Sequence, residues 1–194
     1  DDSRVWAEII RQWSTLHPEF SFLPRKFKIA VTASETDRAA VRFHDIGIAM
    51  RMNDAREIGF EIMVGGGQGR TPMVAQTINE FVPKQHLLSY LEAILRIYNL
   101  MGRRDNIYKA RIKILVHALG IEDFKALVED EWKLIKNGPL KLPIEEVERI
   151  YSNFTPPAWE NLEATSSWLE ARKREDWRFA RWLRTNVTSH KRTG

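Results

Sequence analysis

The sequence contains no cysteine, and this removes several classes of chemistry from its 194 residues. Without thiols it can form no disulfide, no thiolate metal site and no cysteine nucleophile of its own. Its five histidines are scattered and show none of the close spacing that metal ligands adopt. No Ser–His–Asp arrangement is recognisable either. The remaining candidates for function are charged residues and glycines.

Long apolar runs are also missing. No stretch of about 18 apolar residues occurs, so the sequence predicts no membrane-spanning helix. The first residues, Asp1-Asp2-Ser3-Arg4, lack the basic and apolar regions of a signal peptide. Together with the absence of cysteine, this predicts a cytoplasmic protein. Because the chain starts at Asp1 rather than at Met, we expect it to be a piece of a longer protein.

Charge is plentiful but unevenly distributed. The chain has 30 Lys and Arg against 26 Asp and Glu, a formal net charge of +4, and residues 170–194 carry a clear excess of cations. A second basic cluster lies within residues 103–113. An apolar fraction of 43% is ordinary for a globular protein with a core. Local clusters of cations favour an anionic ligand.

Apolar periodicity predicts both helices and strands. Helical spacing occurs at residues 4–14, 83–101, 122–135 and from Asp105 or Asn106 to Ala118. Strand-like alternation occurs at residues 26–32, 41–50 and 59–64. A short helix is predicted at residues 72–81, with Val74, Ile78 and Phe81 facing inward. The chain is therefore expected to mix the two kinds of structure.

The most distinctive motif is a glycine-rich loop, Gly65-Gly66-Gly67-Gln68-Gly69-Arg70-Thr71-Pro72. It follows a predicted strand and precedes the predicted helix, with Thr71 as a good N-cap and Pro72 suited to the first helical position. Glycines let the backbone approach a ligand, and free N–H groups at a helix start attract an anion. The loop is neither a Walker A loop nor a Rossmann fingerprint. It predicts an anion cradle, and a tight turn is the alternative.

Two basic segments are candidates to complete this cradle. The first is Leu23-Pro24-Arg25-Lys26-Phe27-Lys28, whose alternative reading is a solvated strand edge protected by lysine. The second contains Arg111 and Lys113, a planar fork and a mobile point charge that both stabilise oxyanions. In mid-helix these two side chains would diverge by roughly 200°. They converge on one ligand only if the segment is extended or irregular, and a basic helix face is the alternative.

One further polar motif, His44-Asp45, lies at a predicted strand. It is interpreted as a structural polar pair rather than as part of a catalytic arrangement.

Taken in order, these motifs resemble the sirohaem-dependent sulfite and nitrite reductases, most closely the bacterial sulfite reductase haemoprotein (beta) subunit. The resemblance covers residues 20–135. The residues that carry it are Leu23–Lys28, His44-Asp45-Ile46-Gly47, Gly59-Phe60, Val64–Arg70, Arg104-Asp105-Asn106 and Ala110-Arg111-Ile112-Lys113. Residues 181–194 resemble the opening of the family's second ferredoxin-like half-domain.

The resemblance implies an α+β fold, a mixed β-sheet flanked by helices, with a helical or irregular C-terminal connector. It divides the chain into four parts. These are an N-terminal linker helix at 1–20, a first sirohaem-binding domain at 21–140, a connector at 141–180 and the start of the second half-domain at 181–194.

The resemblance also implies a function for the intact protein, the six-electron reduction of sulfite to sulfide at a sirohaem coupled to a [4Fe–4S] cluster. Ferredoxin or a flavoprotein would supply the electrons. The family's cluster ligands are cysteines, which this chain lacks, so the piece alone is not expected to be active. Sirohaem carboxylates and the substrate oxyanion both need cations and N–H donors around them.

Site residues follow from the same resemblance, position by position. Arg25 and Lys113 would face the substrate. Arg111 stands where some members have a second lysine, and it would contact either the substrate or the sirohaem carboxylates. The residues that would line the sirohaem are Gly65, Gly66, Gly67, Arg70 and Thr71.

Alternatives remain at this point. Reduction of nitrite to ammonia uses the same cofactors. From the residues alone, a basic module that binds nucleic acid or another anion through residues 170–194 and their interleaved tryptophans is possible; its binding would weaken steeply with salt. A cofactor-free interaction domain is a third option. The reductase interpretation predicts no nucleic acid and no membrane partner.

Overall fold

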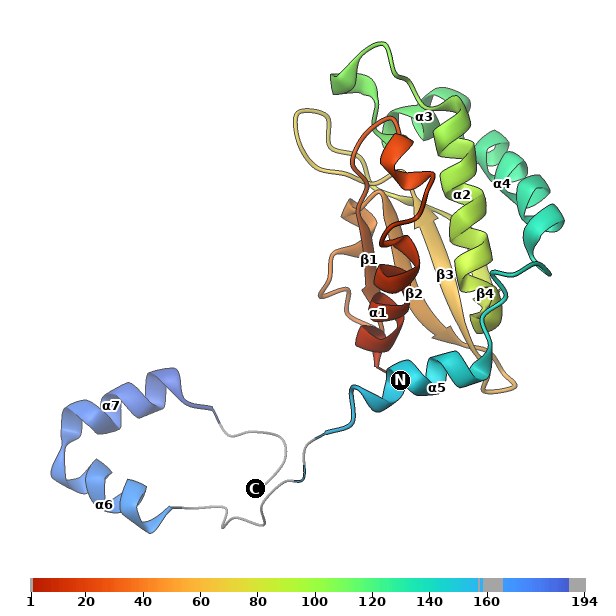
Figure 1. Ribbon diagram of the computed structural model, residues 1–194. Coiled ribbons are helices and arrows are strands. Elements are labelled where there is room, and N and C mark those ends of the chain that lie inside the picture. Colours follow the sequence, from red (N-terminus) through yellow and green to blue (C-terminus); the bar gives the residue numbers. More distant parts are fainter. Residues whose placement is uncertain (1, 157, 159–165, 189–194) are drawn as a thin grey trace. The chain divides into compact units, whose positions relative to one another are not determined.

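The computed structural model describes residues 2–156, 158 and 166–188. The chain divides into two compact units, Asp1–Phe154 and Thr155–Gly194, each described here by itself (Figure 1). The part of the expected half-domain at residues 189–194 lies outside the described residues.

The first unit is built on a four-stranded mixed sheet in the order β1-β2-β3-β4. β1 runs parallel to β2, and the other neighbours are antiparallel. The strands are β1 (Ile29–Thr32), β2 (Ile46–Met52), β3 (Ile58–Val64) and β4 (Gln76–Pro83). The helices of this unit are α1 (Ser3–Ser14), α2 (Leu87–Met101), α3 (Ile112–Leu119), α4 (Ile121–Ile135) and α5 (Ile144–Ser152). The expected α+β class is confirmed.

The main core lies between one face of the sheet and the helices α1 and α2, with α4 beside α2 (Figure 1). Fully buried strand residues such as Ile48 and Ile62 face the apolar stripe of α2, which includes Leu91 and Tyr98. In α1, within the segment expected as a linker helix, Trp6 packs edge-on against Phe60 with ring centroids 4.8 Å apart. Burial of these apolar faces is the main stabilising term of the unit.

The helix predicted at residues 72–81 is wrong, because this segment forms β4. Its Ile78 and Val82 are buried on the sheet, whereas Val74, expected inside, is 55% exposed. Apolar residues at the spacing of Val74, Ile78 and Phe81 suit either a helix or a twisted strand. Pairing with β3 decides between them, and a break in the register beside Ile62 absorbs the irregular spacing.

The remaining elements agree with the predictions in kind and differ in their ends. α1, α2 and α4 form where helices are expected. The strand predicted at residues 41–50 begins instead with a 3-10 turn at Val41–Phe43, and β2 starts only at Ile46. β1 begins at Ile29, three residues later than residue 26.

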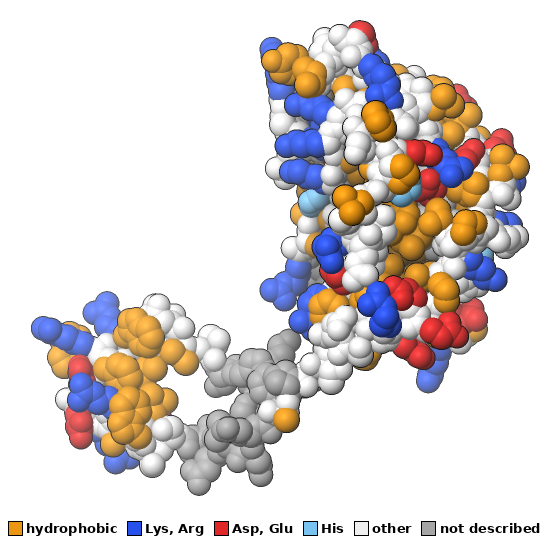
Figure 2. Space-filling view, viewed as in Figure 1, with side chains coloured by type: hydrophobic (Ala, Val, Ile, Leu, Met, Phe, Trp, Pro, Cys, Tyr) orange, Lys and Arg blue, Asp and Glu red, His pale blue; other side chains and the backbone are white. Residues whose placement is uncertain are grey.

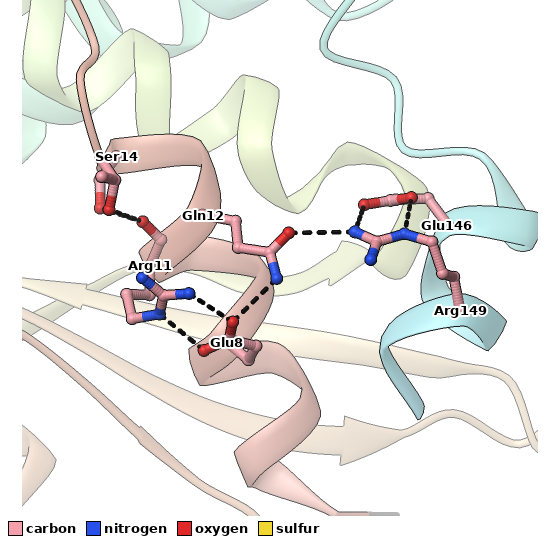
Figure 3. A network of polar contacts seen from close by, with 7 residues as sticks. Glu8, Arg11, Gln12, Ser14, Glu146 and Arg149 are labelled. Atoms are coloured by element: carbon pink, nitrogen blue, oxygen red, sulfur yellow. Dashed lines mark hydrogen bonds and ion pairs between the residues drawn. The ribbon is translucent and has the colours of Figure 1, made fainter. Parts of the chain in front are cut away.

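α5 lies against α1 and extends the first unit to Phe154, past the boundary expected at residue 140. Arg149 joins the two helices by donating to Gln12 Oε1 at 3.0 Å, and Gln12 in turn donates to Glu8 (Figure 3). Arg11 also donates to Glu8 and lowers the pKa of this carboxyl to about 2. Such exposed pairs contribute little stability, so the fully buried Ile150 is the main anchor of α5.

The second unit is a helical hairpin of α6 (Ser167–Glu175) and α7 (Trp177–Asn186). Asp176 ends α6 and caps α7 with its carboxylate. Among the residues that the structure describes here, only Leu183 is buried. Three tryptophans are more than half exposed, and Figure 2 shows apolar side chains gathered on the hairpin beside Lys and Arg. Across the described parts of both units, no helix has the length and apolar character needed to cross a membrane.

Gly66 offers a test of how tightly the glycine-rich loop is packed. A Cβ on Gly66 would lie 2.4 Å from Arg42 O and 2.5 Å from His44 O, which are backbone atoms that cannot rotate away. We expect Gly66→Ala to lower the free energy of unfolding by about 1–3 kcal/mol, measured by denaturant unfolding. In the control Gly138→Ala, the nearest atom would be Ile135 O at 3.1 Å, so the loss should be smaller. Equal losses would contradict this view of the loop.

Candidate anion-binding site

The glycine-rich loop connects β3 to β4 as a hairpin. Gly67 and Met73 exchange backbone hydrogen bonds of 2.9 and 2.8 Å, which leaves residues 68–72 as an exposed tip. The expected helix start behind the loop is therefore absent, and Thr71 caps no helix. Gly65 donates its N–H to Asp45 O at 3.1 Å, and the Gly67 N–H is used on Met73. Two of the three consecutive glycines thus have no free N–H for a ligand.

Because these glycines have no side chain, they leave room for neighbouring groups to pack against the loop. Gly65 adopts φ of +92°, a left-handed conformation that other residues rarely tolerate. A Cβ on Gly67 would lie 2.9 Å from Arg111 Nη2, so a side chain there would displace that guanidinium. The loop is shaped around the side chains of α3.

Arg111 and Lys113 converge on this loop. The helix expected to run to Ala118 is broken into a 3-10 turn at Ile107–Lys109 and α3, with Arg111 as the extended residue before α3. Arg111 lies beside Gly67, and Lys113 Nζ donates to Gln68 O at 3.3 Å and to Thr71 O. The segment is therefore irregular, and the side chains of Arg111 and Lys113 can converge on one ligand.

Asp45 holds Arg111 in place. Its Oδ1 accepts from Arg111 Nε at 3.0 Å and from Nη2 at 2.7 Å, and its Oδ2 accepts the Lys28 N–H at 3.1 Å. Asp45 is 1% exposed and the Arg111 side chain 19% exposed. The expected His44–Asp45 pair is wrong, because His44 Nδ1 lies 2.9 Å from Ala40 O instead.

Lys113 is a buried amine that loses its proton more readily than an ordinary lysine. It is 7% exposed. Burial lowers the pKa of Lys113, the neighbouring Arg111 charge lowers it further, and Asp45 partly opposes the change. An ammonium of lowered pKa is suited both to attract an oxyanion and to give it a proton.

Arg25 is connected to the segment before Arg111 through hydrogen bonds that involve backbone carbonyls. Its Nη1 donates to Ile107 O, and Arg25 also lines a cavity of about 510 Å³ together with Trp13 and Phe27. The Tyr98 hydroxyl lies 3.4 Å from Arg25 O and donates to Ala110 O at 2.8 Å. Arg25 is therefore linked to the residue that precedes Arg111.

Tyr98 and Asp45 are two residues of this site that were not among the predicted site residues, although Asp45 stands in the His44-Asp45 motif. Tyr98 lies on the apolar stripe of α2. Burial raises the pKa of Tyr98 to about 12, so its hydroxyl keeps its proton and acts as a donor. A hydroxyl within an apolar stripe was the available signal, since a buried tyrosine needs a hydrogen-bond partner.

The structure thus brings together most of the predicted site residues. Arg111 and Lys113 lie beside Gly67, Gly65 and Gly66 precede it in the same loop, and Arg70 and Thr71 lie on the exposed tip. The Arg70 side chain makes no hydrogen bond or ion pair with any described residue. Basic side chains gather along the same edge of the first unit in Figure 2. In the described ranges, no group of metal-ligating side chains occurs.

Comparison with known proteins identifies the family to which this chain is similar. Residues 1–136 match the family model described as the nitrite and sulphite reductase 4Fe-4S domain. Sulfite reductase (ferredoxin) 1 of Mycolicibacterium paratuberculosis is 32% identical over 147 residues, 75% of this chain and 26% of that protein. The sulfite reductase (NADPH) hemoprotein beta-component of Staphylococcus haemolyticus is 36% identical over 108 residues, 52% of this chain and 19% of that protein.

A solved structure gives the same result. The NirA protein of Mycobacterium tuberculosis superposes with a TM-score of 0.59 at 29% identity, over 67% of this chain and 23% of that one. The chain spans about a quarter of the length of these relatives. Because the family model matches most of the chain, this chain belongs to the nitrite and sulphite reductase 4Fe-4S domain family.

Proposed function

We propose that the full-length protein containing this chain reduces sulfite to sulfide with six electrons, and that this chain supplies a basic wall of the site. The observation that carries the proposal is the convergence of Arg111 and Lys113 on the glycine-rich loop, in a family whose similar members are named sulfite reductases. Nitrite reduction is the close alternative, since the family description includes both substrates.

Sirohaem is the proposed cofactor beside this wall, and the residues present fit part of its needs. Arg70 is an exposed cation without a described partner, and Thr71 adds a hydroxyl next to it. Gly69, at φ +108°, has no atom within 4 Å of a built Cβ, so there is open space at the tip. We propose that Arg70 and Thr71 bind sirohaem carboxylates, while Gly65, Gly66 and Gly67 shape the wall.

The [4Fe–4S] cluster is proposed to be held elsewhere in the full-length protein. This chain has no cysteine, so thiolate ligands would have to come from residues outside it. No step is therefore assigned to cluster ligation by the residues of this chain.

The chemistry requires many protons at one small anion. Each sulfite oxygen must leave as water, and sirohaem, when bound, would supply the electrons at a metal centre. We propose that Arg25 and Lys113 bind the oxyanion, and that Lys113 Nζ delivers a proton to a sulfite oxygen. Its lowered pKa makes this transfer easier, and its contacts with Gln68 O and Thr71 O orient the amine.

The domain roles and cellular setting are likewise proposals. Residues 21–140 would form the first sirohaem-binding domain, residues 141–180 the connector and residues 181–194 the start of the second ferredoxin-like half-domain. The electron donor would be ferredoxin or an NADPH-fed flavoprotein, and the names of similar proteins include either ferredoxin or NADPH. The protein would act in the cytoplasm, without nucleic acid or membrane partners.

Arg25 gives the first test of the proposed function. In the full-length protein loaded with its cofactors, Arg25→Ala should lower kcat/KM for sulfite about a hundredfold, with a much smaller loss of sirohaem content, because Arg25 is proposed to bind substrate. Arg104→Ala is a matched control. Arg104 also donates to backbone carbonyls, Phe22 O at 2.8 Å and Asn99 O at 2.7 Å, but has no proposed substrate contact.

Steady-state kinetics and absorption spectra would be recorded on both variants with sulfite and with nitrite. Equal loss of activity and sirohaem in Arg25→Ala would make Arg25 a cofactor anchor. A preference for nitrite in the parent protein would replace the proposed substrate.

Lys113 gives the second test. Lys113→Met should reduce kcat about a hundredfold and remove the decline of kcat with rising pH. The decline is expected because the proton donor is lost as pH rises through the lowered pKa of Lys113. The exposed Lys109→Met is the control and should keep both the rate and the profile. A Lys113→Met profile that retains the same decline would exclude Lys113 as the donor.

A further inference from the structure

Asp45 connects four parts of the first unit at the anion site. Its side chain binds Arg111 before α3 and the Lys28 N–H before β1, while its backbone O accepts the Gly65 N–H after β3. Asp45 itself lies directly before β2. Every one of its oxygens is therefore engaged within the protein.

We propose that Asp45 is a positioning residue of the anion site, and that Arg111, as its partner, fixes the glycine-rich loop rather than binding the substrate. The proposal rests on the proposed function for what the site binds. Its structural content is that the Asp45–Arg111 pair holds the loop over Lys113.

The contacts of Arg111 support a structural task. Two of its nitrogens are used on Asp45 Oδ1, at 3.0 and 2.7 Å, and one of them lies against Gly67. An incoming anion would have to compete with a carboxylate that is 1% exposed and already bound to this guanidinium. Arg111 is thus a compensated charge.

Lys113 is in the opposite situation. Its hydrogen bonds go to two neutral carbonyls, Gln68 O and Thr71 O, on the tip of the loop. No carboxylate among the described residues forms an ion pair with it. Arg111 Nη2 lies against Gly67, in the same loop that carries the two acceptors of Lys113. We therefore expect loss of Asp45 to free both the guanidinium and the loop.

The chain offers a matched control for the loss of a buried, paired carboxylate. Glu92 in α2 is 2% exposed, accepts from Arg96 Nε at 3.1 Å and lies 3.2 Å from His17 Nε2. Its described contacts do not include the glycine-rich loop. Glu92→Gln therefore removes a comparable charge at a place that cannot position Lys113.

The test compares Asp45→Asn, Glu92→Gln and the double variant Asp45→Asn with Arg111→Gln in the full-length protein. Acetylation of Lys113 by an amine-reactive acetylating reagent would be followed by peptide mass spectrometry against pH. In Asp45→Asn, the Lys113 rate should rise roughly tenfold, because the loop is released and an opposing negative charge is lost. The double variant should also label faster than the parent, because it too lacks the pair that holds the loop. Glu92→Gln should leave the rate unchanged.

The same variants also test whether Arg111 contacts the substrate, through KM for sulfite. If Arg111 acts only through the pair, KM for sulfite rises to the same extent in Asp45→Asn and in the double variant, because the loop is released in both. If Arg111 itself binds sulfite, its removal adds a further loss in the double variant, and the proposal is overturned. Should Asp45→Asn not fold, the double variant decides: faster labelling of Lys113 supports the proposal, and failure of both to fold assigns Asp45 to global folding and overturns it.

Failure of the proposed function is separable from failure of this inference. A parent protein that reduces no sulfite would contradict the function, while the labelling of Lys113 would still report on Asp45. Unchanged labelling in folded Asp45→Asn would overturn the inference even in an active sulfite reductase.

Discussion

The buried ion pair between Asp45 and Arg111 is the interaction on which the candidate site depends. Taking two charges out of water is costly, and the pair is tolerated because the remaining acceptors of Asp45 are also satisfied, by the N–H groups of Lys28 and Gly65. Removing one partner of a buried pair typically costs about 3–5 kcal/mol. The pair therefore commits the chain to one arrangement of β1, β2, the glycine-rich loop and α3.

This arrangement explains why the glycines matter more for the space that they leave than for the hydrogen bonds that their N–H groups could donate to a ligand. An anion cradle built from backbone N–H groups would need those groups to be free. The N–H of Gly65 instead donates to Asp45 O, and that of Gly67 donates to Met73 O. What the glycines provide is a left-handed turn at Gly65 and room for the guanidinium at Gly67. The groups proposed to recognise an anion are then side chains, namely Lys113, which reaches the loop from α3, and Arg70 on the tip of the loop.

Local pattern predicted much of the fold and little of this pairing. The stripe of α2 was recognisable because Leu87, Leu91 and Ile94 repeat at helical spacing over fifteen residues. β4 was missed because its apolar residues fit two periods, and only its partner strand decides between them. Asp45 and Arg111 are 66 residues apart, so no local signal connects them. Resemblance selected Arg111 and Lys113, but their convergence required the extended residue before α3.

The different roles of Arg111 and Lys113 follow from the geometry of their charged groups. A guanidinium presents a planar fork, which suits a fixed carboxylate such as Asp45, whereas an ammonium is a point charge on a flexible stem. Arg111 has its fork on Asp45 and is rigid. Lys113 rests on two neutral carbonyls that a bound oxyanion can outcompete, because a charged acceptor binds an ammonium more strongly than a neutral one. The proposed site would therefore keep its shape through Arg111 and bind its ligand through Lys113.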